Sequence, residues 1–171
     1  ILGLTLDYGL FGFMEAFDAG HICNHSDHQG RYTYRNQPHI GQWNLYCLAD
    51  AFLPLIGDAE QARAAIDEVY GDAFAGKFER LMRAKLGLRE GLPEDEEFIG
   101  GTFALLQQHR PDFTQFFRRL SGLPDTVNRE NQPKIDAPLR DLFVDRSACD
   151  VWLDNWRARL AKAPWADAVR Q

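Results

Sequence analysis

The segment HIGQWNLYCLADAFL, residues 39–53, decides the fold class because its apolar residues recur at helical intervals. Ile40 and Trp43 begin the pattern, and further apolar residues continue it and widen the same face. We therefore expect a largely buried helix over 39–53 that ends near Pro54 and Gly57.

The chain that follows keeps the helical period. Asp58 with Gln61 three positions later resembles a capping box, which predicts a helix start there. Apolar residues at helical spacing continue from this point towards Leu86. Gly71 and Gly76 could divide this helix into two pieces.

Three further segments complete the helical region. Residues 93–97, PEDEE, predict a helix start whose acids lie near the positive end of the helix dipole. A solvated first turn explains these acids better than a cluster that binds a divalent cation. We also expect helices over 111–122 and 147–162, with a loop over 123–138 between them.

The first 38 residues have a different pattern. Residues 1–6 predict a short strand that the tripeptide DYG, residues 7–9, ends. Residues 10–38 show no sustained period and contain several glycines, which predicts a loop of about thirty residues, a length that is more often functional than idle. The fold class is therefore mainly α: one short N-terminal strand, one long loop and five or six helices.

Composition and charge exclude some classes of function. The formal net charge of -6 disfavours nucleic-acid binding, which needs clustered Lys and Arg. No apolar run is long enough to span a bilayer, and the first fourteen residues are interrupted by Asp7 and lack a basic leader. Cys23, Cys47 and Cys149 are widely spaced and odd in number, which favours a reducing compartment over a disulfide framework. Because the chain begins inside an apolar strand without Met, we expect a fragment.

The polar cluster in ICNHSDHQGRYTY, residues 22–34, allows three interpretations. Cys23, His25, Asp27 and His28 are all legitimate zinc or iron ligands, but their spacing matches no recurrent ligand pattern. Cys23 could instead be a nucleophile activated by His25, although catalytic pairs usually come from separate segments. We favour the third interpretation, in which these side chains satisfy the loop backbone.

Asp7 is a stronger candidate for chemistry. A carboxylate at the end of a buried strand offers a hard oxygen ligand, and such ligands hold Mg²⁺ against nucleotide phosphates. A strand, an Asp-aromatic-Gly tripeptide, a long loop and a tryptophan-bearing helix follow one another here. This order resembles the Asp-Phe-Gly segment, activation loop and central helix of a protein-kinase C-lobe.

The resemblance becomes specific over residues 4–55. DYGLFGFME (7–15), ICNHSDHQGRY (22–32) and NQPHIGQWNLYCLA (36–49) closely match a DYGPFGFMD-type segment, an ICNHSDxxGRY loop and an NQPxxxxWNLxxLA helix start. By these motifs the chain resembles the SelO family of kinase-like proteins. The match is dense over 1–55, and the rest of the chain is compatible with the family without being diagnostic.

The resemblance implies an activity and a site. Members of this family bind ATP in an inverted pose and transfer AMP to Ser, Thr or Tyr hydroxyls of proteins, so ATP and Mg²⁺, or alternatively Mn²⁺, are the implied cofactors. Asp7 would bind the metal and contact the nucleotide phosphates. Arg31 and Tyr32 would lie late in the activation loop, and Trp43 in the buried central helix of the C-lobe. ATP and protein substrates are the implied partners, with no nucleic acid and no membrane.

Some expected parts of the family pattern are missing. Leu10 and Glu15 replace the usual Pro and Asp, which should alter loop stiffness more than chemistry. The catalytic aspartate and its neighbouring asparagine would lie upstream of Ile1, and the nucleotide-binding lysine and glutamate belong to the N-lobe. The family's C-terminal cysteine motif is also missing, although Cys23 could form a redox switch with such a cysteine.

We therefore expect 1–171 to be a single domain, a truncated kinase-like C-lobe made of 1–9, the loop 10–38 and the helical part 39–171. The parent protein would be an adenylyltransferase, and the fragment itself inactive, with no catalytic residue of its own. The alternative is a helical interaction module or a non-catalytic pseudokinase remnant. We expect a cytoplasmic location in a bacterium, or a mitochondrial one in a eukaryote.

Overall fold

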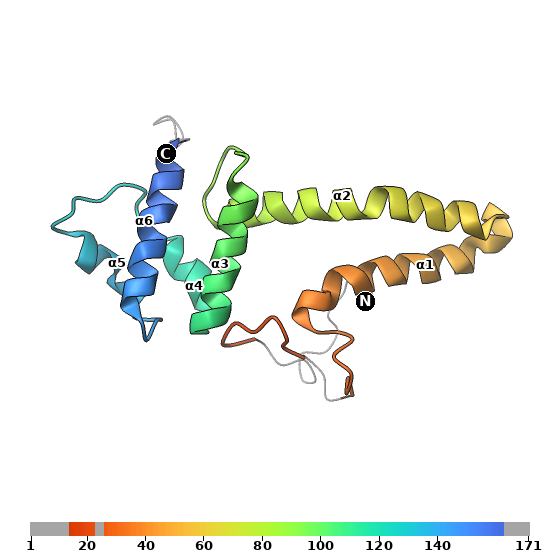
Figure 1. Cartoon of the computed structure of the whole chain (residues 1–171), viewed down its shortest axis with the longest axis horizontal. Coiled ribbons are helices and arrows are strands. Elements are labelled where there is room, and N and C mark those ends of the chain that lie inside the picture. Colours follow the sequence, from red (N-terminus) through yellow and green to blue (C-terminus); the bar gives the residue numbers. More distant parts are fainter. Residues whose placement is uncertain (1–13, 23–25, 163–171) are drawn as a thin grey trace. The chain divides into compact units, whose positions relative to one another are not determined.

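The computed structural model describes residues 14–22 and 26–162, and this part of the chain is mainly helical. Figure 1 shows the helices in chain order. They are a 3₁₀ turn (Tyr34–Asn36), α1 (Gln37–Ile56), α2 (Ala59–Lys85), α3 (Asp95–His109), α4 (Phe113–Leu120), α5 (Gln132–Arg140) and α6 (Arg146–Lys162). The described ranges contain no strand, and the strand expected over 1–6 lies outside them. No helix in these ranges is both long and apolar enough to cross a membrane.

The described residues form two compact units. The first comprises Asp18–Phe78 together with Met14, and the second comprises Glu15–Phe17 together with the chain from Glu79 onward. Helix α2 begins in the first unit and ends in the second. That 1–171 is a single kinase-like domain stays a prediction.

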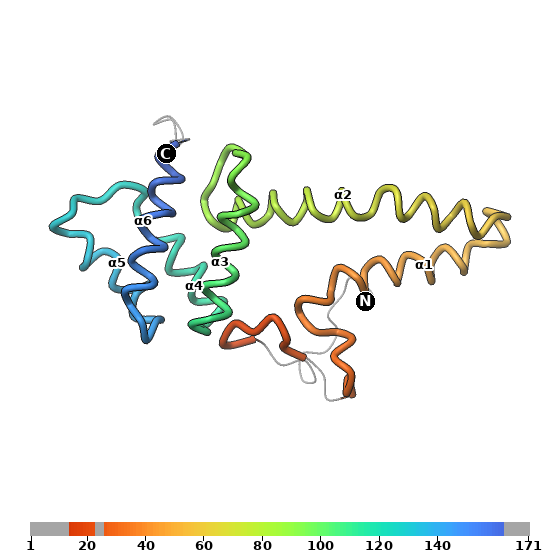
Figure 2. Tube along the Cα trace, viewed as in Figure 1, coloured from red at the N-terminus to blue at the C-terminus, as the bar shows by residue number. Residues whose placement is uncertain are grey.

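The first unit is built on a helical hairpin, in which α1 and α2 run in opposite directions (Figures 1 and 2). Gly57 ends α1 with a left-handed φ of 79°, and its N–H donates to the carbonyl of Leu53 at 2.8 Å. The Asp58 carboxylate then accepts the N–H groups of Glu60 and Gln61 at 2.9 and 3.0 Å. The predicted helix end at Gly57 and the predicted cap at Asp58 are both confirmed.

The predicted burial of the first helix is wrong for the described residues. Pro54 lies inside α1 and does not end it, and Ile40 is the only buried residue of this helix. Trp43, expected in a buried central helix, is 46% exposed. The helical period identifies the apolar residues, but burial depends on what packs against them, and that is not encoded in the period.

Helix α2 is continuous through Gly71 and Gly76, so the expected break is not there. Each glycine costs a helix about 1 kcal/mol relative to alanine, which is too little to interrupt a long helix. The helix has 27 residues and carries basic residues in its last turn, where the helix dipole favours them.

The second unit has a core of aromatic and aliphatic side chains from α3, α4 and α6. Its buried members include Leu106, Phe116, Trp152, Leu153 and Trp156. Each indole N–H of the two tryptophans is satisfied. That of Trp152 donates to the hydroxyl of Thr102 at 3.0 Å, and that of Trp156 to the carbonyl of Leu86 at 2.8 Å.

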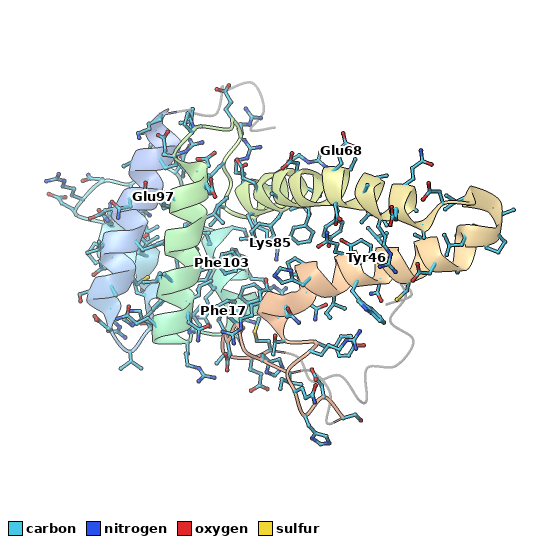
Figure 3. All side chains as sticks on the ribbon, turned by 45° about the vertical axis from the view of Figure 1, so that its right-hand side comes forward. Phe17, Tyr46, Glu68, Lys85, Glu97 and Phe103 are labelled. Atoms are coloured by element: carbon cyan, nitrogen blue, oxygen red, sulfur yellow. The ribbon has the colours of Figure 1, made fainter. Side chains whose placement is uncertain are left out.

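The start of the long loop also packs into this second unit. Phe17 is 2% exposed, and its ring lies 5.6 Å from that of Phe103 and 5.3 Å from that of Phe113. Its N–H donates to the carbonyl of Pro111 at 3.0 Å, and the N–H of Phe113 donates to that of Glu15 at 2.8 Å. These contacts fix residues 15–17, in a loop that the sequence predicts to be irregular (Figure 3).

Helix α5 corrects the loop expected over 123–138. Pro133 lies in the first turn of the helix, where no intrahelical N–H is lost. Pro138 comes near the end of the helix, which limits its cost to the last turn. Buried Asp136 holds the helix to α6 through two hydrogen bonds from Arg157, at 2.6 and 2.8 Å.

The first turn of α3 is only partly solvated. Glu96 and Glu97 are exposed as expected, but Asp95 is fully buried. Its carboxylate accepts two hydrogen bonds from Arg159 of α6, at 2.6 and 3.0 Å, and one from the N–H of Leu92 at 3.0 Å. Asp95 is therefore half of a buried ion pair, which the pattern of acids alone did not reveal.

Candidate functional site

The residues predicted to carry the chemistry lie outside the described residues. These are Asp7 with the rest of the tripeptide 7–9, and Cys23 with His25. Within 14–22 and 26–162, no three His, Cys, Asp or Glu side chains are grouped closely enough to hold a metal ion. The prediction of Asp7 as metal and nucleotide ligand therefore remains a prediction, and so does the redox role of Cys23.

The described part of the candidate site is the loop end, residues 26–37. Asp27 organises its first turn: one carboxylate oxygen accepts the N–H of Arg31 at 2.9 Å and the other that of Tyr32 at 2.7 Å. The hydrogen bond from Tyr32 is the main cause that lowers the pKa of Asp27, and others from the turn add to it. Asp27 thus satisfies loop backbone, as the favoured interpretation of the polar cluster expected.

Two side-chain amides fix the second half of the loop end. Asn36 donates to the carbonyl of Arg31 at 2.5 Å, and Gln37 donates to that of Tyr32 at 2.8 Å. Both amides stand at the start of α1, in the NQP tripeptide of the family motif. This motif therefore holds the loop end to the first turn of the helix.

Backbone hydrogen bonds tie the loop end to residues 19–21. The N–H of Arg35 donates to the carbonyl of Ala19 at 2.9 Å, and the N–H of Tyr34 donates to that of His21 at 3.1 Å. Burial raises the pKa of the Tyr34 phenol. The Nε2 atom of His21 is buried and has no hydrogen-bond partner within the described ranges.

A cationic stack lies on the exposed side of the loop end. The Arg31 guanidinium carbon is 4.1 Å from the centroid of the Trp43 ring and 5.6 Å from that of Tyr32. All three residues are exposed. The cation–π contact orients the guanidinium group and leaves its N–H groups free to donate hydrogen bonds in the plane of that group. The arrangement can present an oriented positive charge to an acidic or phosphorylated group.

Helix α2 holds the first turns of α1, which directly follow the loop end. The Tyr70 hydroxyl donates to the carbonyl of Pro38 at 2.7 Å, and it lies so close to Gly41 that a Cβ there would overlap it. Further along the hairpin, the hydroxyl of Tyr46, which is labelled in Figure 3, donates to the Asp67 carboxylate. This hydrogen bond is the main cause that raises the pKa of Tyr46.

Sequence reasoning did not identify these interhelical contacts. Tyr70 and Asp67 looked like ordinary members of a helix, and pairing across a hairpin cannot be read from one helix at a time. The available signal was Gly41, a glycine in the middle of the first strongly helical segment. A glycine there costs helix stability, which indicates a close approach by a neighbour.

The structure describes two cysteines, and both are free thiols. Cys149 is fully buried in the second unit, and burial raises its pKa to about 12, so it carries almost no thiolate at neutral pH. Cys47 is exposed on α1. Neither is part of the loop end.

Comparison with known proteins establishes the family. The family described as "Protein adenylyltransferase SelO" matches residues 1–170, which is nearly the whole chain. The chain belongs to the SelO family, as its loop and helix motifs predicted.

Similar proteins from bacteria carry the name "Protein nucleotidyltransferase YdiU". That of Dechloromonas aromatica (strain RCB) is 75% identical over 171 residues, which cover 100% of this chain and 34% of that protein. That of Herminiimonas arsenicoxydans is 53% identical over 160 residues, covering 94% of this chain and 31% of the relative. That of Cupriavidus metallidurans is 48% identical over 183 residues, covering 99% and 32%. The chain thus spans about a third of the length of these relatives.

Proposed function

We propose that this chain is part of a protein adenylyltransferase that transfers AMP from ATP to Ser, Thr or Tyr hydroxyls of proteins. The observation that carries the proposal is the family match over residues 1–170. Relatives named as protein nucleotidyltransferases support the same class of reaction. In this reaction a protein hydroxyl oxygen bonds to the α-phosphorus of ATP, the bond to the β-phosphate oxygen breaks, and pyrophosphate leaves.

Asp7 is the residue of this chain proposed to hold the metal. Its carboxylate is a hard oxygen donor of the kind that Mg²⁺ prefers, and Mn²⁺ accepts the same donor. When bound, the metal would neutralise negative charge on the nucleotide phosphates. The proton of the attacking hydroxyl is proposed to go to a carboxylate outside these 171 residues.

The loop end is proposed to receive the protein substrate. Its backbone is held by Asp27 from one side and by Asn36 and Gln37 from the other, which favours a fixed surface over a mobile one. Arg31 lies on that surface with its guanidinium oriented by Trp43. A substrate segment with an acidic residue near its hydroxyl fits this charge.

The test is replacement of Asp7 by alanine in the complete parent polypeptide. We expect metal-dependent AMP transfer, measured as the mass added to a protein substrate, to fall by at least about a hundredfold, because loss of a metal-binding group removes stabilisation of the transition state. Asp72→Ala is the matched control, since it removes an exposed carboxylate from α2 and should leave the rate unchanged.

Retained AMP transfer in folded Asp7→Ala would contradict the role of Asp7. If the unchanged parent polypeptide transferred no AMP from any metal–ATP complex yet bound a protein partner through the loop end, the alternative would hold. That alternative is a helical interaction module or a non-catalytic pseudokinase remnant.

A further inference from the structure

Helix α1 is rich in large apolar residues, although Gln37, His39, Gln42, Asn44 and Asp50 give it polar positions as well. Apart from His39, Asp50 is the only ionisable acid or base among its 20 residues, setting aside the weakly acidic Tyr46 and Cys47. A helix with so many large apolar side chains typically buries most of them against other elements. Its large apolar side chains are nevertheless exposed in the described structure: Trp43, Leu45, Leu48, Phe52, Leu55 and Ile56.

Part of this surface has a defined shape. Leu45, Leu48, Phe52 and Ile56 recur at three- and four-residue intervals along α1, and they face a groove of about 520 Å³ between α1 and α2. The α2 side is lined by Gln61, Ala62, Ala65 and Ile66, and Ala49 completes the α1 side. The three alanines leave room for another backbone to come close, since interaxial distance depends on side-chain size at the contact. We call this surface the hairpin groove.

The helical hairpin that forms the groove carries more acids than bases. Between Gln37 and Phe78 there are six acids and two bases, the bases being Arg63 and Lys77. Arg63 and Asp50 pair with each other at 3.3 Å, which leaves five acids and one base, Lys77, outside that ion pair. An apolar groove on a hairpin with an excess of acids fits an amphipathic helix whose apolar face is flanked by Lys and Arg.

The length of the relatives leaves room for such a helix in the same polypeptide. This chain corresponds to 34% of the Dechloromonas aromatica protein, so a polypeptide of similar length has about two thirds of its residues elsewhere. We propose that the hairpin groove binds an amphipathic helix with basic flanks that belongs to the same polypeptide and lies outside these 171 residues. This inference concerns assembly of the polypeptide and does not depend on AMP transfer.

Photo-cross-linking in the complete parent polypeptide tests the proposal. Benzoylphenylalanine replaces Phe52, which is 48% exposed in this structure and lines the groove, and in a second variant it replaces Leu48. After irradiation, we expect mass spectrometry to find a cross-link within one polypeptide. Its other end should lie outside the 171 residues, in a segment with apolar residues three and four apart and flanking Lys or Arg. The matched control replaces Val144, which is fully exposed in the turn before α6 and should give no such cross-link.

Thiol labelling gives an independent readout in the same polypeptide. In a Cys47→Ser background, a cysteine replacing Phe52 should react at least about tenfold more slowly in the native than in the denatured protein, because a covered site reacts only after local opening. A cysteine replacing Val144 should react at similar rates in both. Equal rates for the Phe52 position would overturn the proposal, as would cross-links to a second copy, to a separate protein, or only to residues within the 171.

Discussion

Gly41 and Tyr70 form a contact that helix propensity alone would not select. Glycine normally weakens a helix, yet here the absence of a Cβ lets the Tyr70 hydroxyl reach the carbonyl of Pro38. The hydrogen bond that this glycine permits therefore joins α2 to the first turn of α1. The same turn of α1 carries Gln37, whose side-chain amide donates to the carbonyl of Tyr32 in the loop end.

Gly41→Ala is expected to destabilise the chain by about 1–3 kcal/mol, as overpacking does in other proteins. The new Cβ would overlap the Tyr70 hydroxyl and displace it from Pro38. Urea denaturation measures the change. Adding Tyr70→Phe should recover part of the loss, because the nearest remaining ring atom then lies 3.5 Å from the Cβ, an ordinary contact.

Gly71→Ala is the matched control on α2. Nothing lies within 4 Å of a Cβ at this position, so alanine should raise stability by about 0.5–1 kcal/mol. A result in which both alanine variants stabilise the chain would show that the Tyr70 contact does not constrain position 41.

At the scale of elements, the ion pair between Asp95 and Arg159 joins the start of α3 to α6. Arg159 also donates to the carbonyl of Glu90 at 2.6 Å, so its guanidinium binds both α3 and the connection that precedes α3. Burial raises the pKa of Asp95, but the hydrogen bonds from Arg159 and Leu92, together with nearby positive charge, outweigh burial and lower it overall. A lowered pKa makes the pair a source of stability that depends on pH.

Asp95→Asn is expected to cost about 3–5 kcal/mol at neutral pH, because it leaves the Arg159 charge buried without its partner. In the unchanged chain, the Asp95 contribution is present above about pH 4, the pKa of an unfolded-state aspartate, and is lost as pH falls through the lower folded-state pKa. Urea denaturation at a series of pH values measures both effects. A variant with the same acid sensitivity as the unchanged chain would contradict this account.

Glu94→Gln is the control for that experiment. Glu94 forms an exposed pair with Lys162 at 2.6 Å, only one residue away from Asp95. Exposed pairs contribute little because water and salt screen them. We therefore expect a much smaller change than for Asp95→Asn.

The elements show what a sequence can and cannot predict. Local chemistry fixed the boundaries well: the Asp58 cap and the Gly57 turn both lie where the sequence placed them. Burial was harder to predict, because α1 has the apolar composition of a core helix although most of its large apolar side chains are exposed in the described structure. Helix α5 was missed, although its two prolines lie at positions that a helix tolerates, one in the first turn and one near the end.

The candidate site divides in the same way. Residue motifs identified the family and predicted Asp7 and Cys23, which lie outside the described residues. They also correctly suggested that Asp27 serves the loop backbone. They could not indicate the stack of Arg31 on Trp43, because these residues are twelve positions apart and meet only when the loop end folds onto α1.

At the scale of the whole molecule, the chain spans about a third of its relatives' length. We expect these 171 residues alone to transfer no AMP and to bind Mg–ATP weakly, because one proposed metal ligand cannot replace a general base and a phosphate-binding lobe. Titration calorimetry with Mg–ATP and a mass assay for AMP transfer check this. Tight binding or transfer by the 171-residue chain would refute it, with the complete parent polypeptide as the positive control.

The Tyr70–Pro38 hydrogen bond also limits how this part of the family can change in length. One residue inserted in α2 before Tyr70 would turn that side chain by about 100° and move it about 1.5 Å along the axis. The hydroxyl would then miss its carbonyl. Insertions and deletions that arise during evolution should therefore collect at the tip around Gly57, where a longer connection need not alter the alignment of the two helices.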